Sequence, residues 1–351
     1  MPSGTEMENK MLNTVYQLVA PRRFEMVFQN IDLQSDNLVV RPTHMAICHA
    51  DQRYYQGLRP AEILAQKLPM ALIHECIGSV VYDPKGEFKP GQSVVLIPNT
   101  PVEEDEVIAE NYLRSSKFRS SSMDGFLQDC ISLARDRVVV LPEGIDKDVA
   151  AFTELLSVSV HALTKFDRVA HKRRNIMGIW GDGNLGYITA NFCKVMFPEM
   201  KLYIFGVSSE KLADFTFADQ VFHVNEIPED LLVDHAFECV GGQGCQKAID
   251  QIIDHIQPEG TISLMGVSEY PVPINTRMVL EKGLKLVGSS RSGREDFEKT
   301  VALYQSHPEL LNYLSNLVGA KIDVRTVADI TKAFETDIHK PMGKTILVWN
   351  K

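Results

Sequence analysis

The 351-residue sequence has no run of about 18 apolar residues, so it predicts no helix that spans a membrane. Residues 1–10 are polar and lack the apolar core of a signal peptide, and we expect residues 1–13 to form a disordered extension. Basic residues are outnumbered by acidic ones. The sequence has 36 lysines and arginines but 46 aspartates and glutamates, which gives a net charge of -10. Nucleic-acid-binding proteins usually carry a basic face, so this balance argues against that class.

Paired cysteines are also missing. The six cysteines form no CxxC motif, and in a chain of this length without a signal sequence they predict reduced thiols in a cytoplasmic protein. Five of the six are best explained as small buried hydrophobic residues, whereas Cys48 stands apart because of its neighbours. No internal repeat or low-complexity tract appears.

The composition is otherwise that of a globular protein, with 44% apolar and 23% charged residues, and the length favours two domains. In the first part of the chain, short apolar runs between turn residues predict strands, over residues 38–40, 77–82, 93–97 and 137–141. We expect a β-rich domain that closes partly into a barrel. Residues 101–124 are polar and rich in serine, and they predict a long surface lobe.

The pattern changes after residue 146, where short strands begin to alternate with helical stretches. Helices are expected over residues 148–162 and 185–197, and strands over residues 175–180, 201–205, 233–238, 261–265 and 285–287. This alternation predicts βαβ units and a doubly wound parallel sheet, so the fold class is α/β. A last strand is expected over residues 345–349.

A glycine-rich turn lies between a predicted strand and a predicted helix. Gly181, Gly183 and Gly186 form a GxGxxG motif that also contains Asn184 and Leu185. Such glycines allow a tight turn and a close approach to a pyrophosphate, which the amino end of the helix then binds. The context favours a dinucleotide site over a purely structural turn. Asp182 is unexpected here, because a carboxylate beside a pyrophosphate is repulsive unless it points away.

The end of the second strand indicates which dinucleotide binds. NAD sites usually carry an acidic residue about 20 positions after the turn, where it binds the ribose hydroxyls. Gly206 occupies that position, and Ser208, Ser209 and Lys211 follow it. These side chains could hold a 2′-phosphate, which favours NADPH, although Lys211 could also be an ordinary solvated helix residue.

Four residues that can bind a metal ion precede the turn. Cys48 follows a predicted strand, His74 and Glu75 come just before another, and Glu154 lies where the helical region begins. Thiolate, imidazole and carboxylate ligands suit zinc, and three protein ligands leave a position open for catalysis. Each residue alone would have an ordinary explanation, a core cysteine or a surface glutamate, but together they predict a catalytic zinc site.

The order of these motifs resembles the zinc-dependent medium-chain dehydrogenase/reductase superfamily, from about residue 15 to the end. The resemblance implies a GroES-like catalytic domain of residues 14–153 and 291–351, and a Rossmann domain of residues 154–290. It implies that Cys48, His74 and Glu154 bind one zinc ion, with Glu75 as a fourth or exchanging ligand. Residues 99–129 contain no cysteine, so we expect no second, structural zinc. Many relatives have a hydroxyl residue where this chain has Ala50, so His49, Glu75 or a metal-bound water would carry the proton.

Longer strings are similar to the bacterial ribulose-5-phosphate reductases, at residues 50–57, 99–101, 109–121, 178–190 and 288–293. That resemblance implies NADPH-dependent formation of D-ribitol 5-phosphate for teichoic acids or capsules. It also implies a ribitol-5-phosphate cytidylyltransferase as a working partner, and assembly into dimers or tetramers.

A phosphorylated substrate needs cationic or donor-rich partners. The candidates are Arg53, Tyr54, Lys117, Arg119 and Arg291. For the residues of the serine-rich lobe the alternative is a flexible charged loop. Two other functions stay open from the sequence: an NAD-dependent dehydrogenase of neutral polyols, and a non-catalytic zinc protein that kept the fold.

Overall fold

The computed structural model describes residues 9–340 and 342–351. The chain divides into two compact units, residues 1–154 with 292–351, and residues 155–291. Glu154 therefore belongs to the first unit and Arg291 to the second, one residue away from the expected boundaries. Within the described ranges, no helix has the length and hydropathy needed to cross a bilayer.

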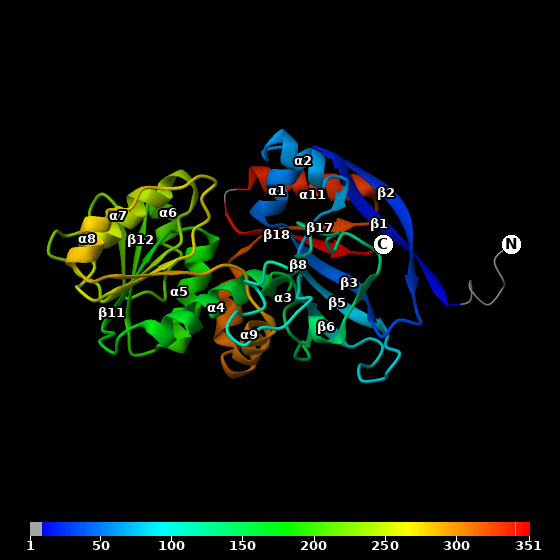
Figure 1. Ribbon diagram of the computed structural model, residues 1–351, viewed down its shortest axis with the longest axis horizontal. Coiled ribbons are helices and arrows are strands. Elements are labelled where there is room, and N and C mark those ends of the chain that lie inside the picture. The colour runs from blue at the N-terminus through cyan, green and yellow to red at the C-terminus, as the bar shows by residue number, and fades with distance from the viewer. Residues whose placement is uncertain (1–8, 341) are drawn as a thin grey trace. The chain divides into compact units, whose positions relative to one another are not determined.

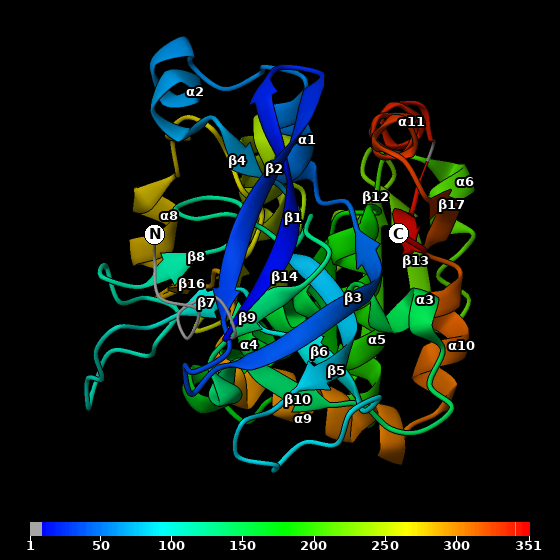
Figure 2. The same cartoon turned by 90° about the vertical axis from the view of Figure 1, so that its right-hand side faces the viewer.

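Two sheets form the framework of the first unit. One has the strand order β2-β1-β4, and the other is seven-stranded, with the order β10-β6-β5-β3-β18-β17 and β9 paired to β3. Figure 2 shows β1 and β2 as a long twisted ribbon. The strands are β1 (Lys10–Ala20), β2 (Arg23–Asp32), β3 (Leu38–Ala46), β4 (Met70–Ala71), β5 (Glu75–Tyr82), β6 (Ser93–Leu96), β9 (Ile131–Leu133), β10 (Val138–Val140), β17 (Val318–Val324) and β18 (Lys344–Trp349).

The beginning of the chain differs from the expectation of a disordered extension over residues 1–13. Lys10 to Asn13 open strand β1 and pair with Asp32 to Gln29 of β2, so backbone hydrogen bonding orders them. Residues 1–8, which the same expectation covered, lie outside the described residues.

Short helices and a lobe complete the first unit. The predicted lobe of residues 101–124 is largely irregular, and its end pairs β8 (Lys117–Phe118) with β7 (Asn99–Thr100). The predicted helix of residues 148–162 is split into α3 (Lys147–Ala150) and the start of α4 (Thr153–Val169). The other helices are α1 (His49–Tyr55), α2 (Ala61–Lys67), α9 (Arg294–Ser306), α10 (Glu309–Ser315) and α11 (Val327–His339).

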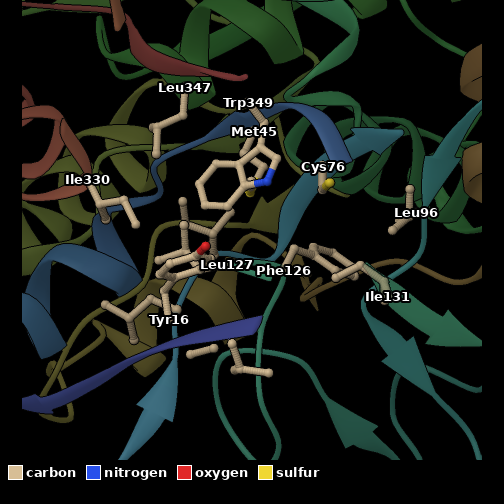
Figure 3. Packing of buried hydrophobic residues seen from close by; sticks show 14 of the residues in the cluster. Tyr16, Met45, Cys76, Leu96, Phe126, Leu127, Ile131, Ile330, Leu347 and Trp349 are labelled. Carbon is tan, nitrogen blue, oxygen red and sulfur yellow. The ribbon is translucent and has the colours of Figure 1, made fainter. Parts of the chain in front are cut away.

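The core of the first unit lies between its sheets and helix α11. The rings of Tyr16 and Trp349 meet edge to face, with centroids 5.4 Å apart, and Phe126 and Leu127 point toward the same core (Figure 3). This packing joins β1 to the last strand of the chain, so it fixes the framework that carries the site.

The second unit is a six-stranded sheet in the order β13-β12-β11-β14-β15-β16, and its strand pairs are all parallel. Figure 1 shows its strands among helices that include α5 and α7. Strand order reverses at β11, which is where ligands bind at the carboxyl ends of such sheets. The elements are β11 (Ile176–Trp180), α5 (Asn184–Met196), β12 (Lys201–Gly206), α6 (Ser209–Leu212), β13 (Gln220–His223), β14 (His235–Glu238), α7 (Cys245–His255), β15 (Thr261–Leu264), α8 (Thr276–Glu281) and β16 (Lys285–Gly288).

Candidate active site

The pairing of β3 brings the metal-binding candidates of the first unit together. Ala46 at the end of β3 lies opposite Glu75 at the start of β5, and also opposite Ile346 near the start of β18. Cys48 lies two residues after β3, and His74 lies directly before β5. Three segments that are far apart in sequence therefore meet at one end of the sheet because of strand register.

Cys48, His74 and Glu75 form a compact group whose ligand atoms all lie within 4.8 Å of one another. Glu154 is adjacent to it, because its Oε2 lies 4.0 Å from Nε2 of His74. His74, Glu75 and Glu154 are buried, and Cys48 is partly buried. The four residues expected to bind zinc are thus brought together, with Glu154 at the edge of the group.

Asp51 fixes the histidine, although no sequence motif pointed to this residue. Its Oδ1 lies 3.6 Å from Nδ1 of His74 and accepts the N–H of Ile73 at 3.0 Å and the hydroxyl of Ser120 at 2.6 Å. Its Oδ2 accepts the N–H of Cys48 at 3.1 Å. A carboxylate at Nδ1 leaves Nε2 as the nitrogen that can bind a metal.

The backbone before the histidine adopts an unusual conformation. Ile73 has φ 70°, in the left-handed region that a β-branched residue rarely adopts. Its N–H is held by Asp51 at 3.0 Å, and its carbonyl accepts the N–H of Phe126 at 2.7 Å. Both contacts hold the segment that aims His74 into the group, and strain of this kind is typical of functional sites.

A buried lysine holds Glu75. Lys344 donates from Nζ to Oε1 of Glu75 at 2.7 Å, and the two side chains are 4% and 0% exposed. Burial alone would lower the pKa of Lys344, but Glu75 and Cys48 raise it, so the ammonium stays charged. The other carboxylate oxygen, Oε2, is buried without a hydrogen-bond partner among the described residues.

The charges of this group fit a bound cation. Burial raises the pKa of Glu154 to about 7, although His74 opposes the shift. Burial also raises the pKa of Glu75, against the effect of Lys344. Such carboxylates are costly to ionise unless a positive charge lies beside them. A divalent ion would supply that charge and satisfy Oε2 of Glu75, and the sulfur, nitrogen and oxygen donors suit zinc.

His49 is the proton-transfer candidate beside the group. It opens α1 next to Cys48, and its side chain remains exposed. Partial desolvation lowers the pKa of His49, and Arg53 lowers it further. A neutral imidazole near pH 7 can accept or donate a proton, which keeps His49 available for this role.

The glycine-rich turn of the second unit has the geometry of a phosphate-binding turn. Gly181 has φ 133°, and its N–H donates to the carbonyl of Phe205 at 2.8 Å. A Cβ on Gly186 would lie 1.9 Å from the carbonyl oxygen of Gly181, so only glycine fits there. Gly183 precedes α5, whose first residues are Asn184 and Leu185, and the N–H groups at the start of a helix attract phosphate.

The candidates for the 2′-phosphate lie just beyond β12. Gly206 is its last residue and is buried. Ser208 caps α6 by accepting the N–H of Lys211 at 3.3 Å. Ser209 is exposed and the side chain of Lys211 is partly exposed, so both remain accessible to a phosphate.

Two substrate candidates have other tasks in the structure. Arg119 is 7% exposed, and its guanidinium donates to the carbonyls of Asp124 and Ser132 at 3.2 and 3.0 Å. Tyr54 is 5% exposed and belongs to the hydrophobic core. The guanidinium of Arg119 is thus engaged with backbone carbonyls and the ring of Tyr54 packs in the core, so a role of either side chain in phosphate binding stays a prediction.

The remaining candidates are more accessible. Lys117 is exposed and lies next to Phe118, whose ring centroid is 5.5 Å from that of His74. Arg53 lies on α1, five residues after Cys48, and is partly exposed. Arg291 is partly exposed at the end of the second unit, with φ 59°. Lys117 and Arg53 thus lie beside segments that carry the metal-binding candidates.

The chain is similar to known dehydrogenases. Residues 34–143 match the alcohol dehydrogenase GroES-like domain, and residues 208–306 match the zinc-binding dehydrogenase family. These matches confirm the expected α/β fold with a GroES-like domain and a Rossmann domain.

Close relatives match nearly the whole length of the chain. The ribulose-5-phosphate reductase of Bacillus spizizenii is 56% identical over 339 residues, which cover 97% of this chain and 99% of the relative. Ribulose-5-phosphate reductase 1 of Staphylococcus aureus is 55% identical with the same coverage. The crystal structure of S. aureus TarJ in complex with NADPH matches with a TM-score of 0.88 at 50% identity, over 97% of this chain and 100% of that one. The chain therefore belongs to the ribulose-5-phosphate reductase family of zinc-dependent medium-chain dehydrogenases.

Proposed function

We propose that this protein reduces D-ribulose 5-phosphate to D-ribitol 5-phosphate with NADPH. The observation that carries the proposal is the buried group of Cys48, His74 and Glu75, in a chain 56% identical to a ribulose-5-phosphate reductase along its length. When bound, zinc would polarise the substrate carbonyl and NADPH would supply the hydride.

The chain's own residues prepare this chemistry. Cys48, His74 and Glu154 would hold the metal, and Asp51 orients the imidazole of His74 through Nδ1. Lys344 keeps Oε1 of Glu75 engaged, so Oε2 is the oxygen that would be available to a metal ion. Burial excludes bulk water from these side chains, which strengthens every charge interaction among them.

Reduction of a ketone also consumes a proton. Ala50 offers no hydroxyl where many superfamily members have one. We assign proton delivery to His49. This residue follows Cys48 in the sequence, and the pKa of its imidazole is lowered below the ordinary value. Glu75 is the second candidate, through Oε2.

The substrate phosphate needs a cation outside the buried group. Arg53 and Lys117 are our candidates in the first unit, since both belong to segments next to metal-binding residues and both are accessible. Arg291 is the candidate in the second unit. A charge-assisted bond to phosphate is worth roughly 1.5–3 kcal/mol, so the loss of one should lower kcat/KM by about 10- to 150-fold.

NADPH oxidation with ribulose 5-phosphate, ribulose and a neutral hexose ketone tests the proposal. We expect rapid turnover only with the phosphorylated pentose, and far slower turnover with NADH. Equal kcat/KM for ribulose and ribulose 5-phosphate would instead support the alternative, an NAD-dependent polyol dehydrogenase.

The cellular setting follows from the product. D-ribitol 5-phosphate is a precursor that a cytidylyltransferase would activate for teichoic acid or capsule synthesis, so we infer such an enzyme as the working partner. The use of NADPH and a sugar phosphate implies a cytoplasmic location. We also infer a homo-oligomer, a dimer or a tetramer, which analytical ultracentrifugation would test.

A further inference from the structure

The aspartate within the glycine-rich turn has a defined partner. Asp182 is 8% exposed, and its Oδ2 accepts the N–H groups of Val207 and Ser208, each at 2.8 Å. The carboxylate therefore points away from the turn's own amides and toward the loop that follows β12. This answers the electrostatic objection to an acid in a pyrophosphate-binding turn, because its charge is bound to other donors.

The side chain of Asp182 also leaves no space for a side chain at Gly206, the last residue of β12. A Cβ on Gly206 would lie 2.6 Å from Cβ of Asp182 and 2.7 Å from its Oδ2. At separations this short, one of the two residues would have to move. The atoms in conflict belong to the short side chain of Asp182, which has little freedom to move aside. Glycine at position 206 is thus a consequence of aspartate at position 182.

The loop that Asp182 holds is tied down on its other side as well. The carbonyl of Gly206 accepts the N–H of Val224 at 2.9 Å, and Nε2 of His223 lies 3.1 Å from the carbonyl of Val207. Ser208 is itself the N-cap of α6. Asp182 therefore sets the backbone from which the candidate 2′-phosphate side chains project.

We propose that Asp182 positions the loop after β12, which carries the candidate 2′-phosphate residues and so selects the cofactor. It anchors Val207 and Ser208 through their N–H groups. It also leaves no space at the end of β12 for the acidic residue that NAD sites carry there. The inference rests on the proposed NADPH dependence. In NAD sites an acid at this strand end binds the ribose hydroxyls and repels a 2′-phosphate. In this chain the carboxylate belongs to Asp182 in the glycine-rich turn, and its Oδ2 accepts two backbone N–H groups.

Calorimetric titration of the protein with NADP+ and with NAD+ tests the proposal without any sugar substrate. Asp182→Ala should weaken NADP+ binding about tenfold and change NAD+ binding by less than about threefold, since the loop loses two charge-assisted anchors. Asp182→Asn keeps an acceptor oxygen and should restore most of the selectivity. The matched control is Asp219→Ala, which removes a carboxylate that accepts the N–H of Leu202 at 2.8 Å near the amino end of the same strand.

Moving the carboxylate gives the sharper comparison. Gly206→Asp alone should lower Tm and weaken both nucleotides, because its side chain collides with Asp182. Combining it with Asp182→Gly removes the collision, and this double variant should recover Tm and bind NAD+ more tightly than NADP+.

The proposal is overturned if Asp182→Ala leaves the NADP+/NAD+ ratio within twofold of the wild type, or if Asp219→Ala shifts the ratio equally. It also fails if Gly206→Asp alone folds normally and prefers NAD+. A wild type that prefers NADP+ but does not reduce ribulose 5-phosphate would contradict the proposed function and leave this inference standing.

Discussion

Replacement of Lys344 with methionine tests whether the buried ion pair holds the candidate metal site together. The variant keeps most of the side-chain volume but leaves Glu75, which is 0% exposed, without its 2.7 Å partner. Breaking a buried pair by removing one member typically costs about 3–5 kcal/mol, because the remaining charge is uncompensated. In a domain of this size 1 kcal/mol shifts Tm by roughly 2–4 °C, so we expect a loss of about 6–20 °C.

A second lysine in the same unit is the matched control. Lys321 lies 2.8 Å from Asp148, but these side chains are 51% and 23% exposed. Exposed pairs contribute about 0–1 kcal/mol, so Lys321→Met should lower Tm by no more than about 4 °C. The double variant Glu75→Gln with Lys344→Met removes both buried charges and should recover much of the loss. Thermal unfolding followed by circular dichroism measures all four proteins, and equal shifts for the two lysine variants would refute the reasoning.

Three further predictions concern the metal, the lobe and acid stability. Elemental analysis should find one zinc per chain in the wild type and a large loss in Cys48→Ser, together with loss of turnover; two zinc ions per chain would contradict the site. Arg119→Ala should lower Tm, because its buried bonds to two backbone carbonyls are lost at about 1–3 kcal/mol each, whereas Lys117→Ala should keep Tm and raise KM for ribulose 5-phosphate only. Burial lowers the pKa of His235 from 6.5 to about 4, so the neutral ring favours folding above pH 6.5 and that stability is lost as the pH falls toward 4. The loss amounts to about 3 kcal/mol, and His235→Asn should flatten the dependence of Tm on pH in this window.

The elements that could be predicted from the sequence are those with a local signal. The GxGxxG turn is recognisable from three glycines between a predicted strand and a predicted helix. The alternation of strands and helices after residue 146 predicts the parallel sheet. Cys48, His74, Glu75 and Glu154 could be selected because their residue types suit zinc and they precede a dinucleotide-binding turn. The structure brings Cys48, His74 and Glu75 together through the pairing of β3 with β5, and Glu154 approaches His74 from the start of α4.

The parts that could not be predicted depend on contacts between distant segments. Lys344 reaches Glu75 across 269 positions of sequence, and only the pairing of β18 with β3 reveals it. Asp51 lies three residues after Cys48, but nothing in the sequence distinguishes it from a surface aspartate. The burial of Arg119 could not be predicted for the same reason, since its serine-rich segment has the composition of an exposed loop. The order of residues 10–13 likewise follows from their partner strand.

Deuterium transfer tests the central claim most directly. The protein would be incubated with NADPH deuterated at C4 of the nicotinamide and with D-ribulose 5-phosphate, and the sugar products would be analysed by mass spectrometry and NMR. The account predicts D-ribitol 5-phosphate with deuterium at C2, no such product after zinc is removed by a chelator, and far less labelled ribitol when ribulose replaces the phosphorylated sugar. Unlabelled sugar phosphate, or equal labelling of ribulose and ribulose 5-phosphate, would contradict it.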